Sequence, residues 1–367
     1  MLKRIYIHNY RTFVNFEWSP PKSCVLVGEN GSGKSSFMDV LVALRGLLIG
    51  GDSVTDLDFA SERTAWLKDA EQKFELELED ADGSFRYILT HHSEGGHSSI
   101  REELYGDGVL IYRSRDGKVE LLGDGMAASP PVVIPYDRHR SFISALESQD
   151  NNHQIVRFRE AIRQIRSIRP DPMSFHEVSR QESTRLAGSL SNFADWYRVR
   201  VGQDPEAVVQ VINDLRVAVT GFVQLRLEPI SSEHKELRVR FRFGQKGHEL
   251  GWSKLSAGQR LLISLYGTFR LGFNVWNTYI FDEIENYVAP KEIQPFLRKL
   301  LDASAEAGKQ VIVISHHPES INYLAADSIW RMWRDPVGGH TRIAKVEADL
   351  DSGETAYDLV KRGEPDA

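Results

Sequence analysis

The sequence predicts an α/β fold with a mixed or parallel core sheet, an antiparallel β subdomain and an inserted helical subdomain. Fully apolar runs at residues 24–27 and 311–314 have the composition of strands buried on both faces. Several runs between residues 74 and 122 alternate apolar and polar side chains, which predicts half-buried antiparallel strands. Apolar residues spaced three and four apart within residues 154–222 predict helices.

The first part of the chain is predicted to be rich in strands. Residues 2–10 alternate apolar and polar side chains, residues 24–27 form a central strand, and residues 35–48 form a helix. Asp82-Gly83 and Asp116-Gly117 fall between the alternating runs, where such pairs favour tight hairpin turns. These elements make an N-terminal lobe over residues 1–140.

The middle and the end of the chain follow a different pattern. After a further core strand at residues 132–136, three helices are predicted at residues 154–168, 192–200 and 205–222, the first ending before Pro170. Strands return at residues 223–228, 237–243 and 248–252, and strand and helix then alternate. We therefore predict an arginine-rich helical insert at 141–222 and a C-terminal lobe at 223–367.

Composition limits the class of protein. The chain has 367 residues, of which 41% are hydrophobic and 26% charged, as in soluble globular proteins. The longest apolar candidate for a membrane span, residues 40–49, is interrupted by Arg45 and Gly46, so we expect a cytoplasmic protein. The single cysteine, Cys24, fits a reducing compartment and a small core position. A net charge of -7 argues against nucleic-acid binding over the whole surface.

A glycine-rich loop follows the apolar strand at residues 24–27. It reads Gly28-Glu29-Asn30-Gly31-Ser32-Gly33-Lys34-Ser35 and precedes a predicted helix. In this context backbone N–H groups and a helix N-terminus bind phosphate. Lys34 would reach the β- and γ-phosphates, and the Ser35 hydroxyl would bind Mg²⁺. A glycine-rich turn that merely contains a lysine is the alternative, and the flanking strand and helix argue against it.

Two later strands end in side chains that suit phosphoryl transfer. Asp282 and Glu283 follow the apolar residues 279–281, and His316 follows residues 311–314 and one serine. Asp282 would hold Mg²⁺, Glu283 would position or deprotonate the attacking water, and His316 would hydrogen-bond phosphate or water. Each of these patterns is common when it stands alone. Their order after a phosphate loop is what makes them a coherent prediction.

A second candidate phosphate contact is Leu255-Ser256-Ala257-Gly258-Gln259, which precedes an apolar helix at residues 260–271. Ser256 lies near the helix N-terminus, where a hydroxyl and backbone donors can meet anionic oxygen. Taken alone, it is more simply an N-cap serine. Because one nucleotide does not need two such loops from one chain, we expect this loop to serve the nucleotide of a second subunit.

Together these motifs resemble ABC-type ATPases of the SMC, RecF and OLD kind, and especially their stand-alone relatives of the AAA_21 type. The resemblance is carried by the following stretches: Ile7-His8-Asn9-Tyr10-Arg11-Thr12-Phe13, the loop from Gly28 to Ser36, Asp282-Glu283-Ile284-Glu285-Asn286 and Ser315-His316-His317-Pro318. It implies an ABC-type head in which ATP is bound by Arg11, Gly28, Asn30, Gly31, Gly33, Lys34, Ser35, Ser36, Ser256, Gly258 and Gln259. Lys34, Glu283 and His316 would be catalytic, with Ser35 and Asp282 on Mg²⁺.

The resemblance further implies a homodimer closed around two Mg-ATP, acting in DNA maintenance or anti-phage defence. The chain lacks sustained heptads between the phosphate loop and Ser256, and about 50 residues follow His316, so we expect a nuclease or other effector to be a separate protein. Ile284 replaces the proline usual in the family. Gln149 and Gln154 are both candidates for the family's Q-loop glutamine. A transporter-type ATPase subunit and a slow regulatory nucleotide-binding module are the alternatives.

The region 138–200 is unusually basic, with 11 arginines, no lysine and seven acidic residues. Several of the arginines have helical spacing and would form one stripe, namely Arg157, Arg159, Arg163 and Arg166. Such a stripe suits the phosphates of double-stranded DNA, a protein interface or a plain solvated face. Trp196 and Tyr197 could stack on bases, although their spacing from Phe193 favours a core role.

Overall fold

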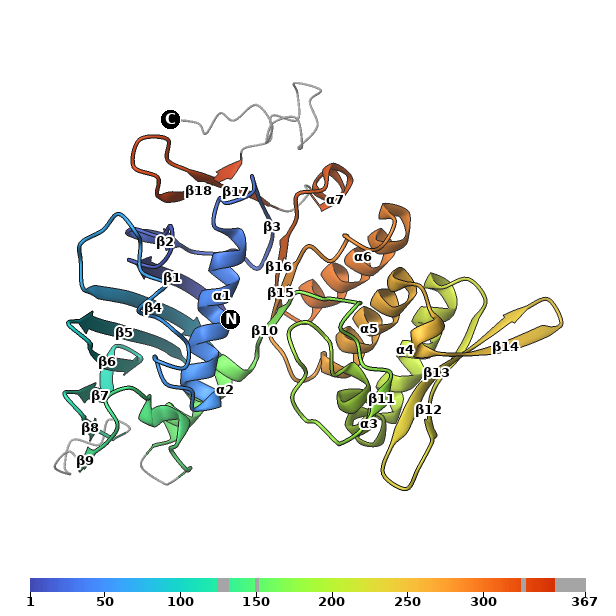
Figure 1. Cartoon of the computed structure of the whole chain (residues 1–367), viewed down its shortest axis with the longest axis horizontal. Coiled ribbons are helices and arrows are strands. Elements are labelled where there is room, and N and C mark those ends of the chain that lie inside the picture. Colours follow the sequence, from blue (N-terminus) through green and yellow to red (C-terminus); the bar gives the residue numbers. More distant parts are fainter. Residues whose placement is uncertain (124–131, 149–151, 325–327, 347–367) are drawn as a thin grey trace. The chain divides into compact units, whose positions relative to one another are not determined.

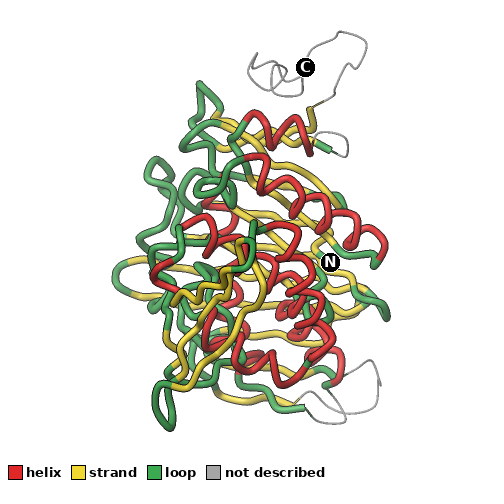
Figure 2. The backbone as a smooth tube through the Cα atoms, turned by 90° about the vertical axis from the view of Figure 1, so that its right-hand side faces the viewer, coloured by secondary structure: helices red, strands yellow, loops and turns green. Residues whose placement is uncertain are grey.

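The computed structural model describes residues 1–123, 132–148, 152–324 and 328–346. It has two compact units, unit 1 with residues 1–165 and 327–367 and unit 2 with residues 166–326. Helices and strands both contribute extensively, as Figure 2 shows, which confirms the α/β class. The unit boundaries differ from the lobe boundaries predicted after residues 140 and 222, because the predicted helical insert is divided between the units and the last strands return to unit 1.

Unit 1 contains an antiparallel sheet of eight strands in the order β2-β1-β4-β5-β6-β7-β8-β9, which can be followed by the strand labels in Figure 1. The predicted alternating runs form its hairpins, and Gly83 and Gly117 have the positive φ that their tight turns require. The strands are β1 (Leu2–His8), β2 (Phe16–Trp18), β4 (Glu71–Glu79), β5 (Ser84–Glu94), β6 (His97–Gly106), β7 (Val109–Arg115), β8 (Lys118–Leu121) and β9 (Val132–Pro135).

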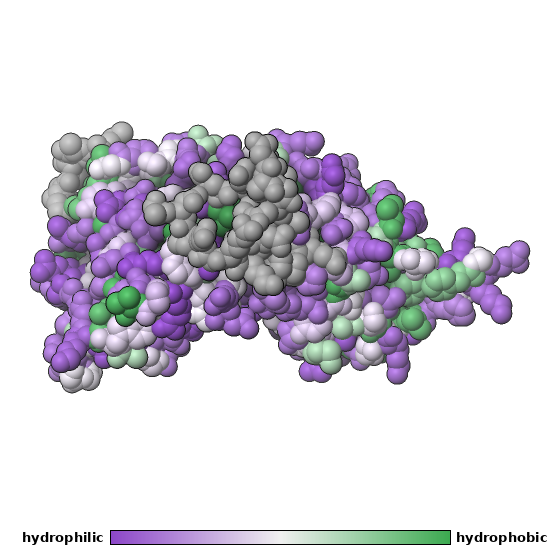
Figure 3. Space-filling model, turned by 90° about the horizontal axis from the view of Figure 1, so that it is seen from above, coloured by the Kyte–Doolittle hydropathy of each residue, from purple (hydrophilic) through white to green (hydrophobic). Residues whose placement is uncertain are grey.

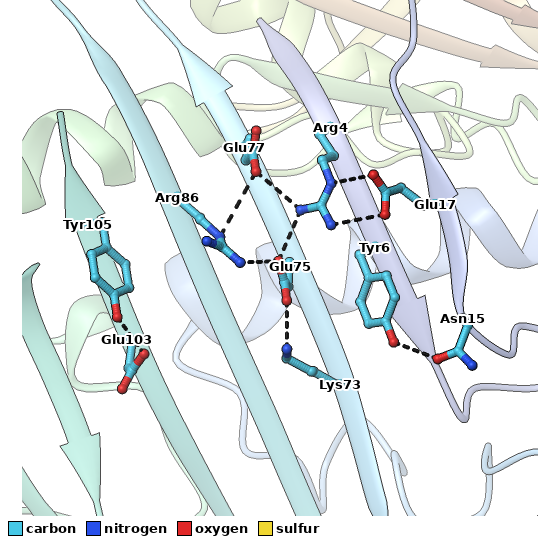
Figure 4. Close-up of polar contacts among 10 residues, drawn as sticks. All are labelled: Arg4, Tyr6, Asn15, Glu17, Lys73, Glu75, Glu77, Arg86, Glu103 and Tyr105. Atoms are coloured by element: carbon cyan, nitrogen blue, oxygen red, sulfur yellow. Dashed lines mark hydrogen bonds and ion pairs between the residues drawn. The ribbon is translucent and has the colours of Figure 1, made fainter. Parts of the chain in front are cut away.

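The two faces of this sheet differ in chemistry. Along β4, Phe74, Leu76 and Leu78 are buried on the core side. The opposite face carries charged side chains that pair across neighbouring strands, as Figure 4 shows. Glu75 lies at the centre of this network and contacts Arg4, Lys73 and Arg86 at 2.7 to 3.0 Å. The alternation therefore gives one apolar and one ion-paired face.

A second group of strands in unit 1 carries the phosphate loop. β3 (Ser23–Gly28) is parallel to β17 (Ile329–Arg334), which pairs in antiparallel fashion with β18 (Thr341–Val346). The loop after β3 leads into α1 (Lys34–Arg45), which continues as a short π-helix (Gly46–Gly50). Phe37 of α1 packs edge-on against Trp18, which in turn contacts Trp330. These aromatic contacts pack the start of α1 against β2, which in turn contacts β17.

The helix predicted at residues 154–168 is correct as far as Arg163 and wrong over residues 165–168, which form a strand. α2 (His153–Arg163) places Phe158 against Phe85 and Tyr87 of the antiparallel sheet. The chain then forms β10 (Ile165–Ile168). Ile165 and Ile168 stand three residues apart, which is a helical spacing, and the four residues show no period-2 alternation that would have indicated a strand. The Arg45 guanidinium donates to carbonyls at the end of α2, which supplies partners that a helix C-terminus lacks.

Unit 2 contains a parallel core and a smaller antiparallel sheet. β15 lies between β10 and β16, and its pairing with β16 is parallel. The core strands are β15 (Thr278–Asp282) and β16 (Gln310–Ile314), and the antiparallel strands are β11 (Val178–Ser179), β12 (Phe222–Pro229), β13 (Lys235–Phe243) and β14 (Lys246–Gly251). The helices are α3 (Phe193–Gln203), α4 (Pro205–Ala218), α5 (Ala257–Gly272), α6 (Pro290–Glu306) and α7 (Pro318–Leu324), with 3₁₀ turns at Phe142–Ser144 in unit 1 and Trp252–Lys254 in unit 2.

Some apolar side chains remain at the surface. β9, predicted as a core strand, is an edge strand on which Val132 and Val133 are 49% and 54% exposed. Figure 3 shows a mainly hydrophilic surface with separate apolar patches, and Phe243 of β13 is among the exposed apolar residues. Among the described residues, we find no helix with the length and apolarity needed to cross a membrane.

Candidate nucleotide-binding site

The phosphate loop of unit 1 has the backbone that its sequence predicts. Gly31 and Gly33 adopt φ of 81° and 110°, a region that favours glycine. Gly33 is also the N-cap of α1, a helix of 12 residues. A Cβ at Gly28 would lie 2.2 Å from the Met332 carbonyl oxygen of β17. The loop glycines are therefore required by backbone conformation and by close packing, and the helix N-terminus provides partial positive charge for phosphate.

Lys34 is 6% exposed, with its ammonium group turned back into the loop. Its Nζ donates to the carbonyl oxygens of Gly28 and Glu29 at 2.7 and 2.9 Å. Ser35 is exposed on the first turn of α1, and Asn30 is exposed in the loop before it. The lysine charge is thus held inside the loop where phosphate oxygens are expected, next to the exposed residue Ser35.

Thr341 supports the loop, a role that the sequence analysis missed. This buried residue begins β18, and its Oγ1 donates to the Ser32 carbonyl at 2.9 Å. The same oxygen lies 2.7 Å from Thr12 Oγ1 and 2.7 Å from the position that a Cβ on Gly33 would take. No local sequence signal marks Thr341, because its partners lie more than 300 residues earlier.

Arg11 lies beside the start of α1, close to the loop as predicted for a nucleotide neighbour. Its guanidinium donates to Asp39 at 2.5 Å, to Glu62 at 2.5 Å and to Ser36 Oγ at 3.3 Å. Hydrogen bonding to Glu62 is the main cause of a raised pKa of Arg11. Its charge is therefore balanced by two carboxylates, while Ser36 links it to the loop helix.

In unit 2 the predicted acidic pair follows β15, and its two carboxylates have different environments. Asp282 is 2% exposed and its Oδ2 accepts a hydrogen bond from Arg169 Nε at 2.6 Å. Glu283 is one-third exposed and has a φ of 50°, which is unusual for a residue with a side chain. Backbone strain of this kind concentrates at functional sites. In this chain the strained residue, Glu283, carries the accessible carboxylate and directly follows the buried one of Asp282.

Glu283 and His316 come together as the sequence predicts. His316 Nδ1 lies 3.3 Å from Glu283 Oε1, and Asn286 Nδ2 donates to Glu283 Oε2 at 3.0 Å. The Glu283 amide donates to the Ile314 carbonyl, so the ends of the parallel strands β15 and β16 are tied together. A half-exposed imidazole thus shares the accessible carboxylate, an arrangement that can orient a water and take its proton.

A buried pair beneath these groups was not predicted as part of the site. Ser315 Oγ donates to Glu285 Oε1, and both residues are nearly inaccessible. Burial raises the pKa of Glu285, although the hydrogen bond from Ser315 opposes this shift. The His317 amide donates to Ser315 Oγ at 3.1 Å. The pair therefore connects the acidic loop to the loop that carries His316.

The segment at Ser256 forms a capping box at the start of α5. Ser256 Oγ accepts from the Gln259 amide at 3.1 Å, and Gln259 Oε1 accepts from the Ser256 amide at 3.1 Å. Ser256 is exposed, and its hydroxyl proton is not used by these two bonds. A Cβ at Gly258 would lie 2.8 Å from the Tyr287 carbonyl oxygen, so close packing requires glycine there. Capping and phosphate contact are thus compatible roles for Ser256.

The available oxygen donors suit Mg²⁺ bound together with a nucleotide. No group of three or more His, Cys, Asp or Glu side chains among the described residues could hold a metal by itself. Ser35 and Asp282 offer a hydroxyl and a carboxylate, which are ligands that Mg²⁺ accepts alongside phosphate oxygens and water. Ser35 belongs to unit 1 and Asp282 to unit 2.

The arginine stripe does not exist as predicted. Arg166 is in β10 rather than α2, is 7% exposed, and bonds the Leu186 carbonyl while its guanidinium lies over Trp276. Arg157 pairs with Asp80 at 2.6 Å.

Arg159 bonds the carbonyls of Ile143 and Leu146, and burial lowers its pKa. Arg163 is 43% exposed and pairs with Glu160. These four residues therefore share no common face, and a DNA contact through them stays an untested prediction.

Two further predictions concern a pair of aromatic residues and the Q-loop glutamine. Trp196 and Tyr197 are 0% and 2% exposed, so they belong to the core and are not available to stack on bases. Gln154, one Q-loop candidate, lies in α2 of unit 1. Gln149, the other candidate, lies outside the described residues.

Comparisons with known proteins identify a family and a fold for this chain. A family model described as "AAA domain, putative AbiEii toxin, Type IV TA system" matches residues 24–322. No curated protein matches the chain significantly. An SMC head domain from Thermotoga maritima is 16% identical with a TM-score of 0.51, and the match covers 95% of this chain and 99% of that one.

A second solved structure, the SmcHead bound to the C-winged helix domain of ScpA, is also 16% identical, with a TM-score of 0.60 over 96% of this chain and 99% of that one. At this identity the structural likeness establishes the fold alone, which is that of SMC head domains. The family match spans most of the chain and includes the phosphate loop, the acidic pair and the histidine loop. The chain therefore belongs to the AAA_21 family and has the fold of the SMC head domains.

Proposed function

We propose that the chain binds ATP with Mg²⁺, hydrolyses it to ADP and phosphate, and closes as a head-to-tail homodimer around two nucleotides. The observation that carries the hydrolytic part is the pairing of Glu283 with His316 at 3.3 Å, at the ends of two parallel strands. The accessible carboxylate is held in a strained backbone conformation, as is common for catalytic groups. We name ATP as the nucleotide because a phosphate loop precedes these groups in a chain that matches an AAA domain family.

The proposed hydrolysis assigns one task to each group. The phosphate loop and Lys34 bind the β- and γ-phosphates, and Ser36 and Arg11 lie close to that loop. Mg²⁺, held by Ser35 and Asp282, would neutralise charge on the phosphate oxygens. Glu283 accepts the proton of the attacking water, and His316 orients that water or the γ-phosphate.

We propose the homodimer because the chain has a second segment that can bind phosphate, at Ser256. The exposed Ser256 hydroxyl at the N-terminus of α5 can donate to a γ-phosphate oxygen while its oxygen caps the helix. We assign this contact, with Gly258 and Gln259, to the ATP on a partner subunit. ATP would then act as a switch whose binding closes the dimer and whose hydrolysis opens it.

The biological role that we propose is DNA maintenance or anti-phage defence with a separate effector such as a nuclease. Its support is the family match, since the matched description names a toxin of a toxin–antitoxin system, and this support is associative. A slow regulatory nucleotide-binding module is distinguished from an active ATPase by its turnover rate. A transporter-type subunit is distinguished by fractionation with membranes.

The hydrolytic proposal is tested by Glu283→Gln, which keeps the shape of the side chain and removes the base. We expect turnover to fall by about 100-fold or more while ATP binding persists. Glu306→Gln, an exposed carboxylate on α6, is the matched control and should keep the wild-type rate. An unchanged rate in Glu283→Gln would remove this residue from the catalytic role.

The dimer proposal is tested by Ser256→Arg in the Glu283→Gln background, where ATP is retained. A bulky cation at the helix start should abolish ATP-dependent dimers in sedimentation velocity and leave nucleotide binding by the monomer intact. Ala305→Arg adds the same group to an exposed position of α6 and should dimerise normally. Persistent dimers of Ser256→Arg would refute the shared site.

A further inference from the structure

A short loop in unit 2 connects the candidate magnesium carboxylate to the segment that carries Ser256. This bridging loop comprises residues 169–177 and follows β10, which lies beside β15. At its start, Arg169 Nε donates to Asp282 Oδ2 at 2.6 Å. At its end, Glu177 Oε2 accepts from the Ser253 amide at 3.2 Å. The loop thus contacts both segments through different residues.

The far end of the bridging loop is held firmly. Phe175 stacks on the buried Trp252 with ring centroids 6.4 Å apart, and the Glu177 carbonyl accepts from the Leu237 amide at 2.8 Å. Trp252 and Ser253 belong to the 3₁₀ turn that ends two residues before Ser256. A displacement of the loop would therefore be passed on to the start of α5.

The near end of the loop depends on a contact that bound metal would disturb. Asp282 is 2% exposed, whereas the Arg169 side chain is 42% exposed and borders solvent. Mg²⁺ beside the Asp282 carboxylate would place a second positive charge next to the guanidinium, and like charges repel strongly where water is excluded. The ion and Arg169 therefore compete for one carboxylate.

We infer that Arg169 is a positioning residue that is displaced from Asp282 when Mg²⁺ binds, and that the bridging loop transmits this displacement to the Ser256 segment. The inference rests on the proposed function, in which Asp282 serves one nucleotide and Ser256 serves the other. Metal binding at one site would then adjust the contact that the same chain makes with the partner's ATP. The two sites of the dimer are coupled within each subunit.

The competition is tested by titrating Mg²⁺ at a fixed concentration of a fluorescent ATP analogue. Arg169→Gln should need about tenfold less Mg²⁺ for half-maximal binding, equivalent to about 1.4 kcal/mol and near the lower range for a hydrogen bond to a charged group. Arg169→Lys keeps the charge and should restore a requirement close to the wild type. Arg185→Gln, an exposed arginine of the same region, should leave the requirement unchanged.

The transmission is tested by hydrogen exchange of the amides of residues 252–259. Mg²⁺ should alter their exchange in the wild-type protein with bound analogue, and should not do so in Arg169→Gln. An equal response in both proteins, or an unchanged or higher Mg²⁺ requirement in Arg169→Gln, would overturn the inference. Those results leave the proposed function standing if the wild type binds Mg-nucleotide, whereas a wild type that binds none refutes both. Because Arg169→Lys retains the cation beside a buried carboxylate, it also controls for loss of folding.

Discussion

Replacing Glu75 by glutamine should destabilise unit 1, because this carboxylate is the centre of the charged network in Figure 4. Burial alone would raise the pKa of Glu75, but hydrogen bonds from Lys73, Arg4 and Arg86 outweigh it and lower the pKa from 4.5 to about 2. The full difference of about 2.5 pKa units corresponds to about 3.4 kcal/mol. Lys73 and Arg86 are 42% and 49% exposed, so solvent screening reduces our expectation to about 1–2 kcal/mol.

The sign of the pH dependence follows from the lowered pKa. The folded state stabilises the ionised carboxylate, so its contribution is fully present above pH 4.5 and is lost as the pH falls toward 2. The difference in unfolding free energy between wild type and Glu75→Gln should therefore be constant from pH 7 to 5.5. It should fall to less than about half by pH 3.

Urea unfolding at several pH values, followed by tryptophan fluorescence and circular dichroism, measures this difference directly. Glu17→Gln is the matched control, because Glu17 shares Arg4 but is 56% exposed, and its substitution should change stability by less than about 0.5 kcal/mol. A Glu75→Gln protein as stable as the wild type at pH 7 would refute the reasoning. So would a difference that stays constant down to pH 3.

Two other substitutions test the support of the candidate site. Gly33→Ala should abolish ATP binding in a filter-binding assay and lower the free energy of unfolding by about 1–3 kcal/mol, because Gly33 has a φ of 110° and no room for a Cβ. The control is Gly108→Ala, which should bind ATP normally because Gly108 has a φ of 81° and open space around it. Ser315→Ala should lower turnover in a phosphate-release assay with little change in ATP affinity. It should also lower the free energy of unfolding by about 1–3 kcal/mol, because it removes the hydrogen-bond donor to buried Glu285. The control is Ser304→Ala, which removes a buried hydroxyl that has no partner among the described residues. It should change neither the turnover nor the free energy of unfolding.

The parts of the site that the sequence predicts correctly are those in which chemistry depends on neighbouring residues. Gly31 and Gly33 are needed for backbone angles within one loop, and the pairing of Glu283 with His316 follows from two apolar strands ending at the same edge. The hairpins of unit 1 follow from alternation and Asp-Gly turns for the same reason. Local rules suffice because the residues that determine each feature lie close together in the chain.

The parts that were missed depend on contacts between distant segments. Arg169 pairs with a carboxylate 113 positions later, and Thr341 supports a loop 309 positions earlier. The strand that precedes Arg169 was predicted to be helical, because its two isoleucines stand three residues apart and show no alternation. This error moved Arg166 onto a helical face and made Arg169 look like the end of a helix. A wrong element thus concealed the ion pair on Asp282.

The outcome for the arginines shows why a count of charges is a weak signal for nucleic-acid binding. A guanidinium has five donors in a planar fork, so it also serves buried carbonyls and carboxylates well. Arg159 and Arg166 bond backbone carbonyls, and Arg169 neutralises a buried acid, so these charges stabilise the fold or the site. Phosphate contacts with nucleic acid require arginines that remain exposed. On β13, Arg240 and Arg242 meet that condition, because both are exposed.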